Sequence, residues 1–181
     1  MRHPQWMMVA CAVALASGCD DGASSGMDAG PMGPQTAEPS AQTAELLAQI
    51  EGYQDWPNFP ENTSPTESES HLGLYVLAFY NPIVGDAITN HTLPLPDGAI
   101  IVKNNYADSA GTQLRAVTIM SKRSGMWYWA KTTPDGRVFV GPNGAPAEGT
   151  DVQSCINCHM GASANDMVFT HQFAAAVDAG T

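Results

Sequence analysis

Short apolar runs with alternating polar positions follow one another through the second half of the chain. Turn-forming sequences such as NPIVGD, RSG and TPDG separate these runs. The runs are rich in β-branched and aromatic residues, and they are HLGLYVLAFY at 71–80, GAIIVK at 98–103, TQLRAVTIMSK at 112–122, MWYWAK at 126–131 and GRVFV at 136–140. Because no long helical pattern lies between them, we expect about five strands in an antiparallel sheet.

A different period, with apolar residues three and four apart, occurs in AQTAELLAQIEGY at 41–53. Leu46, Leu47, Ile50 and Tyr53 fall on one face of a helix, which we expect to end before Pro57. A shorter helix is expected in the tail HQFAAAV at 171–177. The predicted fold class is therefore α+β, a mainly antiparallel sheet with flanking helices, and residues 41–181 are expected to form one domain.

The first 18 residues have the pattern of a secretory signal. Their apolar run, Trp6 to Ala16, is too short to span a bilayer as a mature helix. The sequence LASGC at 15–19 resembles the bacterial lipobox, in which the cysteine, here Cys19, is lipidated and becomes the new N-terminus. The alternative is an ordinary signal with a free cysteine. We expect an exported protein, lipid-anchored to a bacterial membrane and facing the periplasm or the cell exterior.

Between the signal and the first helix, residues 19–40 are rich in Gly, Ser, Pro and Ala and have almost nothing large to bury. Such a segment cannot offset the entropy lost on ordering, so we expect a flexible tether.

The net charge is −11, and ten of the eighteen acidic residues lie between Asp20 and Glu69. This balance argues against nucleic acid, which requires a basic face. The acidic half would suit docking with a basic soluble cytochrome, although a solvated tether needs no partner.

The main chemical motif is SCINCH at 154–159. Cys155 and Cys158 can bond both vinyl groups of one haem, and the adjacent His159 can then bind the iron as proximal ligand, so haem c is the expected cofactor. A zinc site would need a fourth ligand, for which His171 is the only later candidate. A redox disulfide of thioredoxin type would require a βαβ context.

The second axial position is expected to stay open. Only 22 residues follow His159, so Met160 and Met167 lie close to the attachment point and are more typical of packing residues. We expect a five-coordinate iron whose distal face is covered by the sheet.

With these segments in order, the chain resembles the cytochrome P-460 family, which includes the sheet-rich cytochromes c-prime-beta, over about residues 71–173. The resemblance rests on HLGLYVLAFYNP, GAIIVK, LRAVTIMSKRSG, WYWAK, SCINCHMG and NDMVFT. It implies that Cys155 and Cys158 attach the haem, that His159 is the proximal ligand, and that the protein forms a homodimer. It also places Lys103 where catalytic members link a lysine nitrogen to the porphyrin.

One departure from the family concerns the distal side. Members that oxidise hydroxylamine have a carboxylate on the strand leading to SKR, whereas residues 114–120 contain no Asp or Glu, and Arg115 occupies the nearest position. Arginine cannot act as a base, but it can stabilise an anion or pair with a haem propionate. Trp127 and Trp129 share one strand face and are expected to pack in the core or on the haem.

Two functions are compatible with these residues. The first is an oxidoreductase that binds hydroxylamine or nitric oxide at the open iron and transfers electrons to a soluble carrier. The second is a protein that binds nitric oxide or a similar gas without turnover, as the cytochromes c-prime-beta do. The presence of Lys103 favours the first and the missing carboxylate favours the second.

Overall fold

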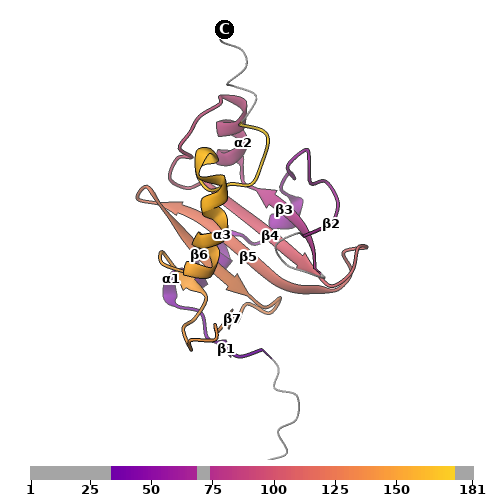
Figure 1. Ribbon diagram of the computed structural model, residues 1–181, viewed down its shortest axis with the longest axis vertical. Coiled ribbons are helices and arrows are strands. Elements are labelled where there is room, and N and C mark those ends of the chain that lie inside the picture. The colour runs from indigo at the N-terminus through magenta and orange to yellow at the C-terminus, as the bar shows by residue number, and fades with distance from the viewer. Residues whose placement is uncertain (1–33, 69–73, 174–181) are drawn as a thin grey trace, which may run out of the picture. The chain divides into compact units, whose positions relative to one another are not determined.

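One twisted sheet organises the part of the chain that the computed structural model describes, residues 34–68 and 74–173 (Figure 1). Its strands run in the order β1-β7-β6-β5-β4-β3-β2, and β8 pairs with β6. All of these pairs are antiparallel. The strands are β1 Thr36–Ala37, β2 Thr66–Glu67, β3 Tyr75–Tyr80, β4 Ile100–Tyr106, β5 Leu114–Arg123, β6 Met126–Thr132, β7 Val138–Phe139 and β8 Glu148–Gly149.

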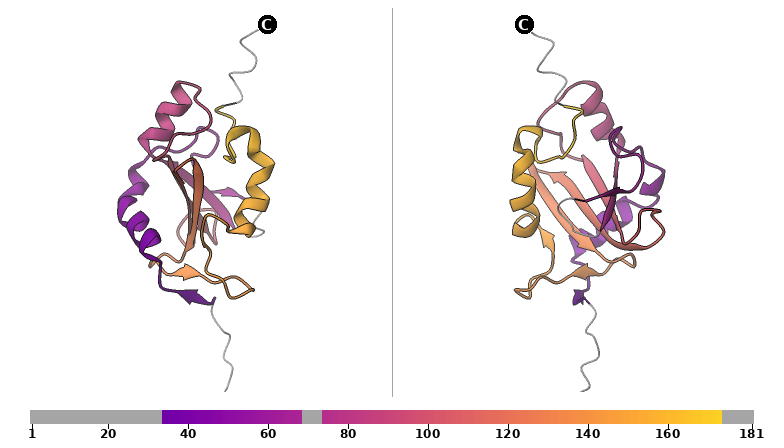
Figure 2. Two further views of the ribbon diagram at one scale, coloured as in Figure 1. Left: turned by 90° about the vertical axis from the view of Figure 1, so that its left-hand side faces the viewer. Right: turned by 45° about the vertical axis from the view of Figure 1, so that its right-hand side comes forward.

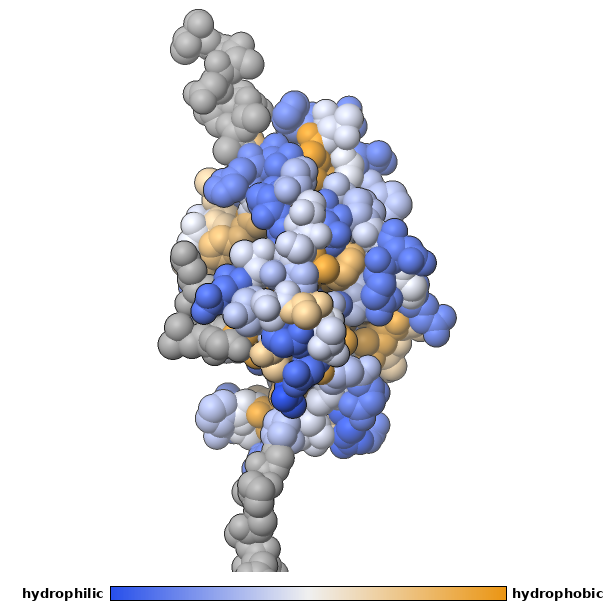
Figure 3. Space-filling model, turned by 90° about the vertical axis from the view of Figure 1, so that its right-hand side faces the viewer, coloured by the Kyte–Doolittle hydropathy of each residue, from blue (hydrophilic) through white to orange (hydrophobic). Residues whose placement is uncertain are grey.

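The helices flank this sheet. Helix α1 (Ala41–Gln49) lies on one face and α3 (Gln153–His159) on the other, while α2 (Pro82–Thr89) lies at one end of the strands (Figure 2). Two 3-10 turns, η1 (Tyr53–Asp55) and η2 (Met160–Asn165), continue from α1 and α3 respectively. Seen from the side of β2 and β3, hydrophilic residues dominate the surface and apolar ones form small separate patches (Figure 3).

The predicted α+β class is confirmed, but the number of strands is larger than expected. The five predicted strands correspond to β3, β4, β5, β6 and β7, and the sheet has eight because β1, β2 and β8 also join it. Each of these three has only two residues. Unlike β7, which lies in the apolar run GRVFV, these three do not fall in an alternating apolar run that a sequence pattern could reveal.

The prediction that NPIVGD forms a turn is wrong. The Asn81 side chain accepts a hydrogen bond from the Val84 N–H, and Pro82 occupies the first turn of α2. An asparagine cap followed by proline is a typical helix start, because proline has no N–H to leave unsatisfied there. The signal was therefore present in the sequence.

Two predicted boundaries also differ. Thr36 and Ala37 pair with β7, and the Ser40 hydroxyl caps α1, so the folded part begins before residue 41 and includes the end of the predicted tether. Residues 171–173 are bend and turn rather than helix. The remainder of that predicted helix, the predicted signal and Cys19 lie outside the described residues. No helix among the described residues is long and apolar enough to cross a membrane.

Strand alternation sorts the buried side chains into two clusters, one on each face of the sheet. The α1 face has the cluster Leu46, Ile50, Tyr53, Phe79, Ile100, Val102, Val117, Ile119, Tyr128 and Ala130. The α3 face has the cluster Phe59, Val84, Ala87, Leu95, Ala99, Ile101, Met120, Trp127, Trp129, Val168 and Phe173. The partly buried Cys155 packs against the second cluster, so the cysteine motif belongs to that face.

Candidate cofactor site

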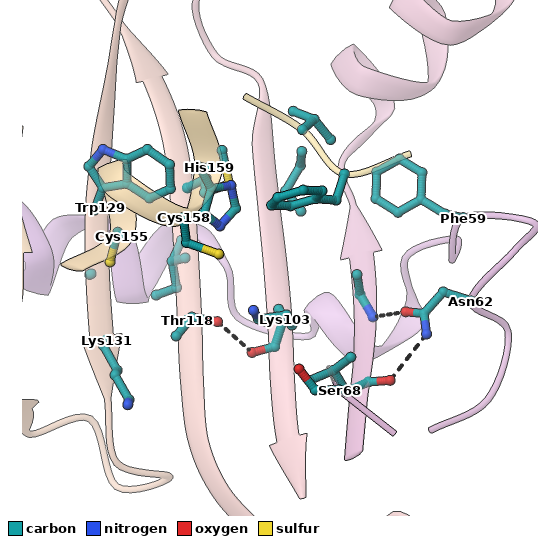
Figure 4. Close-up of a pocket in the computed structure, with 18 of the residues that line it drawn as sticks. Phe59, Asn62, Ser68, Lys103, Thr118, Trp129, Lys131, Cys155, Cys158 and His159 are labelled. Carbon is teal, nitrogen blue, oxygen red and sulfur yellow. Dashed lines mark hydrogen bonds between the residues drawn. The ribbon is translucent and has the colours of Figure 1, made fainter. Parts of the chain in front are cut away.

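A cavity of about 450 Å³ lies between α3 and the sheet (Figure 4). Its wall is mostly apolar, and the apolar residues include Phe59, Val76, Ala78, Ile101, Met120, Trp129, Val168 and Phe169. The polar residues are Glu61, Asn62, Glu67, Ser68, Lys103, Thr118, Lys131, Ser154, Cys155, Cys158 and His159. Although these polar residues are numerous, most of the surface area of the wall is apolar, and a cavity of this size and character is typical of a cofactor or ligand site.

Helix α3 presents the whole cysteine motif to this cavity. Cys155 and Cys158 are separated by nearly one helical turn, and His159 follows at once, so the three side chains lie on adjoining positions of one face. Within the described residues, no disulfide joins the two cysteines. Burial raises the pKa of the Cys155 thiol, although hydrogen bonding from Ser154 and the nearby Lys103 act in the opposite direction.

The His159 ring is fixed from three sides. Its Nδ1 lies 2.7 Å from the backbone oxygen of Met167, while the rings of Trp129 and Phe169 lie 4.8 Å and 5.2 Å from its own ring centre. Burial lowers the pKa of the imidazole. A neutral ring must carry its proton on Nδ1 to donate to a carbonyl, which leaves the lone pair of Nε2 available to a metal.

Lys103 extends from β4 into the same cavity. In register it stands between Ala78 of β3 and Thr118 of β5, and Lys131 follows on β6, so two lysines line one row of the sheet. Burial lowers the pKa of the Lys103 amine, against the smaller influence of Cys158 and Cys155. Within residues 34–68 and 74–173, no side chain forms a hydrogen bond or ion pair with its Nζ.

The two predicted tryptophans lie in different surroundings. Trp129 lines the cavity and packs edge-on against His159. Trp127 is buried next to it, with ring centres 6.5 Å apart, but it does not line the cavity. Its Nε1–H donates to the backbone oxygen of Asp166 at 2.8 Å, so Trp127 is a packing residue of this face.

Arg115, which the sequence offers as a residue for a bound anion or a haem propionate, does not line the cavity. The pairing of β4 with β5 shifts register between Asn105 and Tyr106, and Arg115 has no partner there. Its side chain is exposed, and its guanidinium lies 3.5 Å from the Gln113 side-chain oxygen. Arg115 also alternates with Val117 and Ile119, which belong to the cluster on the α1 face, so it does not share the cavity face of β5.

Two carboxylates that the sequence analysis did not identify line the cavity. Glu61 and Glu67 come from the segment before β3, in which the sequence analysis identified no strand or helix, although Glu67 lies in β2. No local signal marks them, because only the fold of this segment over the sheet brings them near Lys103.

Glu61 is a structural link as well as a wall residue. It accepts hydrogen bonds from the Thr170 hydroxyl at 2.5 Å, the His171 N–H at 2.9 Å and the Gln172 amide at 3.0 Å. Partial burial acts to raise its pKa, but the hydrogen bonds together outweigh it and lower the pKa of this carboxyl. The segment before β3 is thereby tied to the residues that follow the cysteine motif.

The two alternatives for the cysteine motif gain no support. Within the described ranges, no group of three or more His, Cys, Asp and Glu is arranged to hold a metal ion. The antiparallel sheet also lacks the βαβ context of a thioredoxin-like site.

The fold and the site define the class of protein. It is a small antiparallel-sheet domain in which a helix carrying two cysteines and a histidine closes a cofactor-sized, mostly apolar cavity. A family model described as Cytochrome P460 matches residues 50–170, more than half of the chain. The chain therefore belongs to the cytochrome P460 family, which confirms the resemblance seen in the sequence and implies a haem cofactor. None of the curated proteins matches the chain.

The residues present fit this cofactor. Haem is a flat, largely apolar macrocycle whose iron takes an imidazole nitrogen. The cavity offers an imidazole with a free Nε2, apolar and aromatic walls, and two thiols on one helical face. These groups match the apolar faces, the vinyl groups and the iron of a haem.

Proposed function

We propose that the protein is a haem c protein of the cytochrome P460 type that oxidises hydroxylamine, nitric oxide or both. Cys155 and Cys158 would hold the haem through thioethers, and His159 would bind its iron. The bound haem would supply one-electron redox chemistry and an open coordination position. One observation carries the proposal. The cysteine–histidine motif, the amine of Lys103 and the carboxylates of Glu61 and Glu67 all line the same cavity.

The carboxylates matter because oxidation of hydroxylamine releases protons together with electrons. A general base must lie near the reacting group, and β5 supplies none. Glu61 already accepts three hydrogen bonds, which favour its ionised form and make it a weak base. We therefore assign the proton-accepting role to Glu67, with the electrons leaving to a soluble carrier.

Lys103 supports the catalytic reading for a second reason. Its desolvation favours the neutral amine, which is the nucleophilic form. In catalytic members of the family the corresponding lysine is joined to the porphyrin, and Lys103 lies on the cavity wall opposite α3 as such a link would require.

The alternative function is binding of nitric oxide without turnover, as in a cytochrome c-prime-beta. The observation in its favour is the apolar character of the wall, in which Phe59, Val76 and Phe169 surround a space suited to a small uncharged ligand. In that case Lys103 would be a neighbour of the haem with no covalent bond to it.

An optical spectrum and an intact mass of the matured protein test these functions. The catalytic reading predicts covalent haem, a reduced Soret band far to the red of ordinary haem c, and a haem peptide that retains Lys103. Lys103→Met should restore an ordinary haem c spectrum. Lys131→Met, which removes the neighbouring lysine of the same wall, should leave the shifted band in place.

The outcomes separate the two readings. An ordinary haem c spectrum in the wild type, unchanged by Lys103→Met, contradicts the catalytic reading and leaves gas binding. A chain that acquires no haem in the presence of the c-type maturation machinery contradicts both. Turnover is then measured as electrons transferred to a soluble cytochrome with hydroxylamine or nitric oxide as substrate.

We also propose that Cys19 carries a lipid that anchors the protein to a bacterial membrane outside the cytoplasm, and that the folded part forms a homodimer. The motif LASGC supports the anchor, and the family resemblance supports the dimer. Cys19→Ala should release the protein from membranes, and sedimentation of the soluble form should report the dimer mass.

A further inference from the structure

The proximal histidine depends on a backbone carbonyl in a strained part of the chain. The acceptor for Nδ1 of His159 is the oxygen of Met167, and both Asp166 and Met167 have positive φ angles, 52° and 68°. A non-glycine residue in this left-handed region costs free energy and persists only where its surroundings determine it. Something in the fold must therefore hold residues 166–167.

Asp166 is held by three separate contacts. Its carboxylate oxygens both lie 2.8 Å from Nζ of Lys122, and one of them accepts the Leu95 N–H at 2.9 Å. Its backbone oxygen accepts Nε1–H of Trp127 at 2.8 Å. The side chain and the backbone of Asp166 are thus fixed by separate contacts. The carbonyl of the next residue, Met167, is the one that contacts His159.

Lys122 is itself part of the rigid sheet. Its N–H donates to Ala99 at 2.8 Å, its carbonyl accepts the Gly98 N–H at 3.0 Å, and its Nζ lies 4.9 Å from the ring centre of Trp127. The side chains of Lys122 and Asp166 are only 6 % and 15 % exposed. The ion pair therefore connects the central strand β5 directly to the residue beside the Met167 carbonyl.

Stability alone is a weak reason for such a pair. The free energy of hydration that two buried charges lose is about as large as the free energy that they gain by attracting each other. Replacing such a pair by apolar residues therefore often gives a protein of equal stability. A buried pair that joins the loop to the sheet can instead define one position of the chain. The other ion pair among the described residues, Arg137 with Glu38, is exposed and lies away from the cavity.

We propose that Lys122 and Asp166 are positioning residues that hold the Met167 carbonyl against Nδ1 of His159 and so set the electron donation of that imidazole to the haem iron. This inference rests on the proposed function, because it takes His159 as the proximal ligand. A firm hydrogen bond at Nδ1 makes an imidazole a more basic ligand, which strengthens the metal–nitrogen bond and lowers the reduction potential.

The test uses haem-loaded protein and two single variants. Asp166→Asn removes the negative charge of the pair, and Lys122→Met removes the positive charge. The readouts are the iron–histidine stretching frequency of the ferrous protein and its reduction potential. Loss of positioning should lower the frequency and raise the potential in both variants. Electrostatics alone would raise the potential when the anion is removed and lower it when the cation is removed.

Two further variants complete the comparison. Lys122→Arg keeps a cation that can bond both carboxylate oxygens, and it should keep wild-type values. Glu38→Gln removes the exposed ion pair with the same change of charge as Asp166→Asn, and it should also leave both readouts unchanged. If a single variant fails to fold, Lys122→Met with Asp166→Leu replaces the pair by apolar side chains and should show the lowered frequency.

The result that overturns the inference is a pair of potentials that move in opposite directions while the iron–histidine frequency stays at the wild-type value. An apolar double variant with wild-type values would overturn it equally. Failure of the proposed function looks different, because the wild-type chain would then carry no haem by intact mass, or its iron would show no histidine stretching band.

Discussion

The two faces of the sheet use alternate residues of the same strands for different purposes. On the α1 face, Leu46, Val102 and Ile119 are at most 1 % exposed, and the cluster around them is closed. On the α3 face, the cavity interrupts the packing, and Lys103 and Lys131 stand where strand alternation would allow apolar residues. The comparison indicates that the packing on the α1 face stabilises the fold, so that the α3 face can contain a cavity large enough for a cofactor.

The largest expected effect concerns the cofactor face. Replacing Cys155 and Cys158 together by alanine should abolish covalent haem attachment, because both thioether positions are lost. The α1 face contains neither residue, so the sheet should still form. Denaturing intact mass measures the haem, and far-ultraviolet circular dichroism measures the sheet. Each single alanine variant, which keeps one thioether, serves as the control, and covalent haem in the double variant would contradict the assignment.

The next effect is on stability and concerns the α1 face. Leu46 is fully buried, so Leu46→Ala should lower the free energy of unfolding by about 2–5 kcal/mol, as buried leucines do when a cavity remains. Leu47, the next residue of the same helix, is only partly buried. Leu47→Ala should therefore cost clearly less in chemical denaturation. Equal losses in the two variants would show that α1 does not pack as described.

A smaller effect is expected from the polar contacts under α1. The Tyr128 hydroxyl lies 2.8 Å from the Thr43 hydroxyl and 3.3 Å from that of Ser40, so it links β6 to the start of α1. Tyr128→Phe should reduce the free energy of unfolding by about 1 kcal/mol, the usual net value of a hydrogen bond. In Tyr75→Phe the hydroxyl that is lost has no hydrogen bond among the described residues. That control should be neutral, and an unchanged Tyr128→Phe would contradict the link.

The smallest effect is a dependence on pH at the cavity rim. The pKa of Glu61 is lower in the folded protein, so its stabilising contribution is complete above the ordinary pKa of a glutamate and is lost as the pH falls through the lowered value. The protection of the His171 amide hydrogen from exchange, relative to an unprotected amide at the same pH, should fall in that acid range. Glu61→Gln should remove the dependence, whereas Glu67→Gln, on the same segment, should preserve it. An acid response in Glu61→Gln would contradict this assignment.

Much of the fold was predictable because the strands that build it are long enough to show alternation. β3, β4, β5 and β6 each carry six or more residues, and their patterns predicted both the strands and the antiparallel sheet. The strands β1, β2 and β8 were not predictable, because two residues gain their conformation from the neighbour with which they pair. The α2 helix was missed although its cap was readable, since proline was taken as a turn signal alone.

The site divides in the same way. The spacing of Cys155, Cys158 and His159 is local, so the sequence alone identified the cofactor class and the residues that would hold it. Lys103 was indicated by resemblance, and the structure places it in the cavity. Arg115, a candidate for binding an anion or a haem propionate, is exposed and does not line the cavity, and it alternates with Val117 and Ile119 of the α1 face.

The sequence by itself determined the sheet, the α1 helix and the cysteine–histidine motif, because each depends on residues that are neighbours along the chain. Only the tertiary structure decided that Glu61 and Glu67 line the cavity. It also decided that Lys122 forms an ion pair with Asp166, the residue before the Met167 carbonyl that contacts His159. Those contacts join residues that lie tens of positions apart. Their partners are selected by the packing of whole elements, for which the sequence carries no local signature.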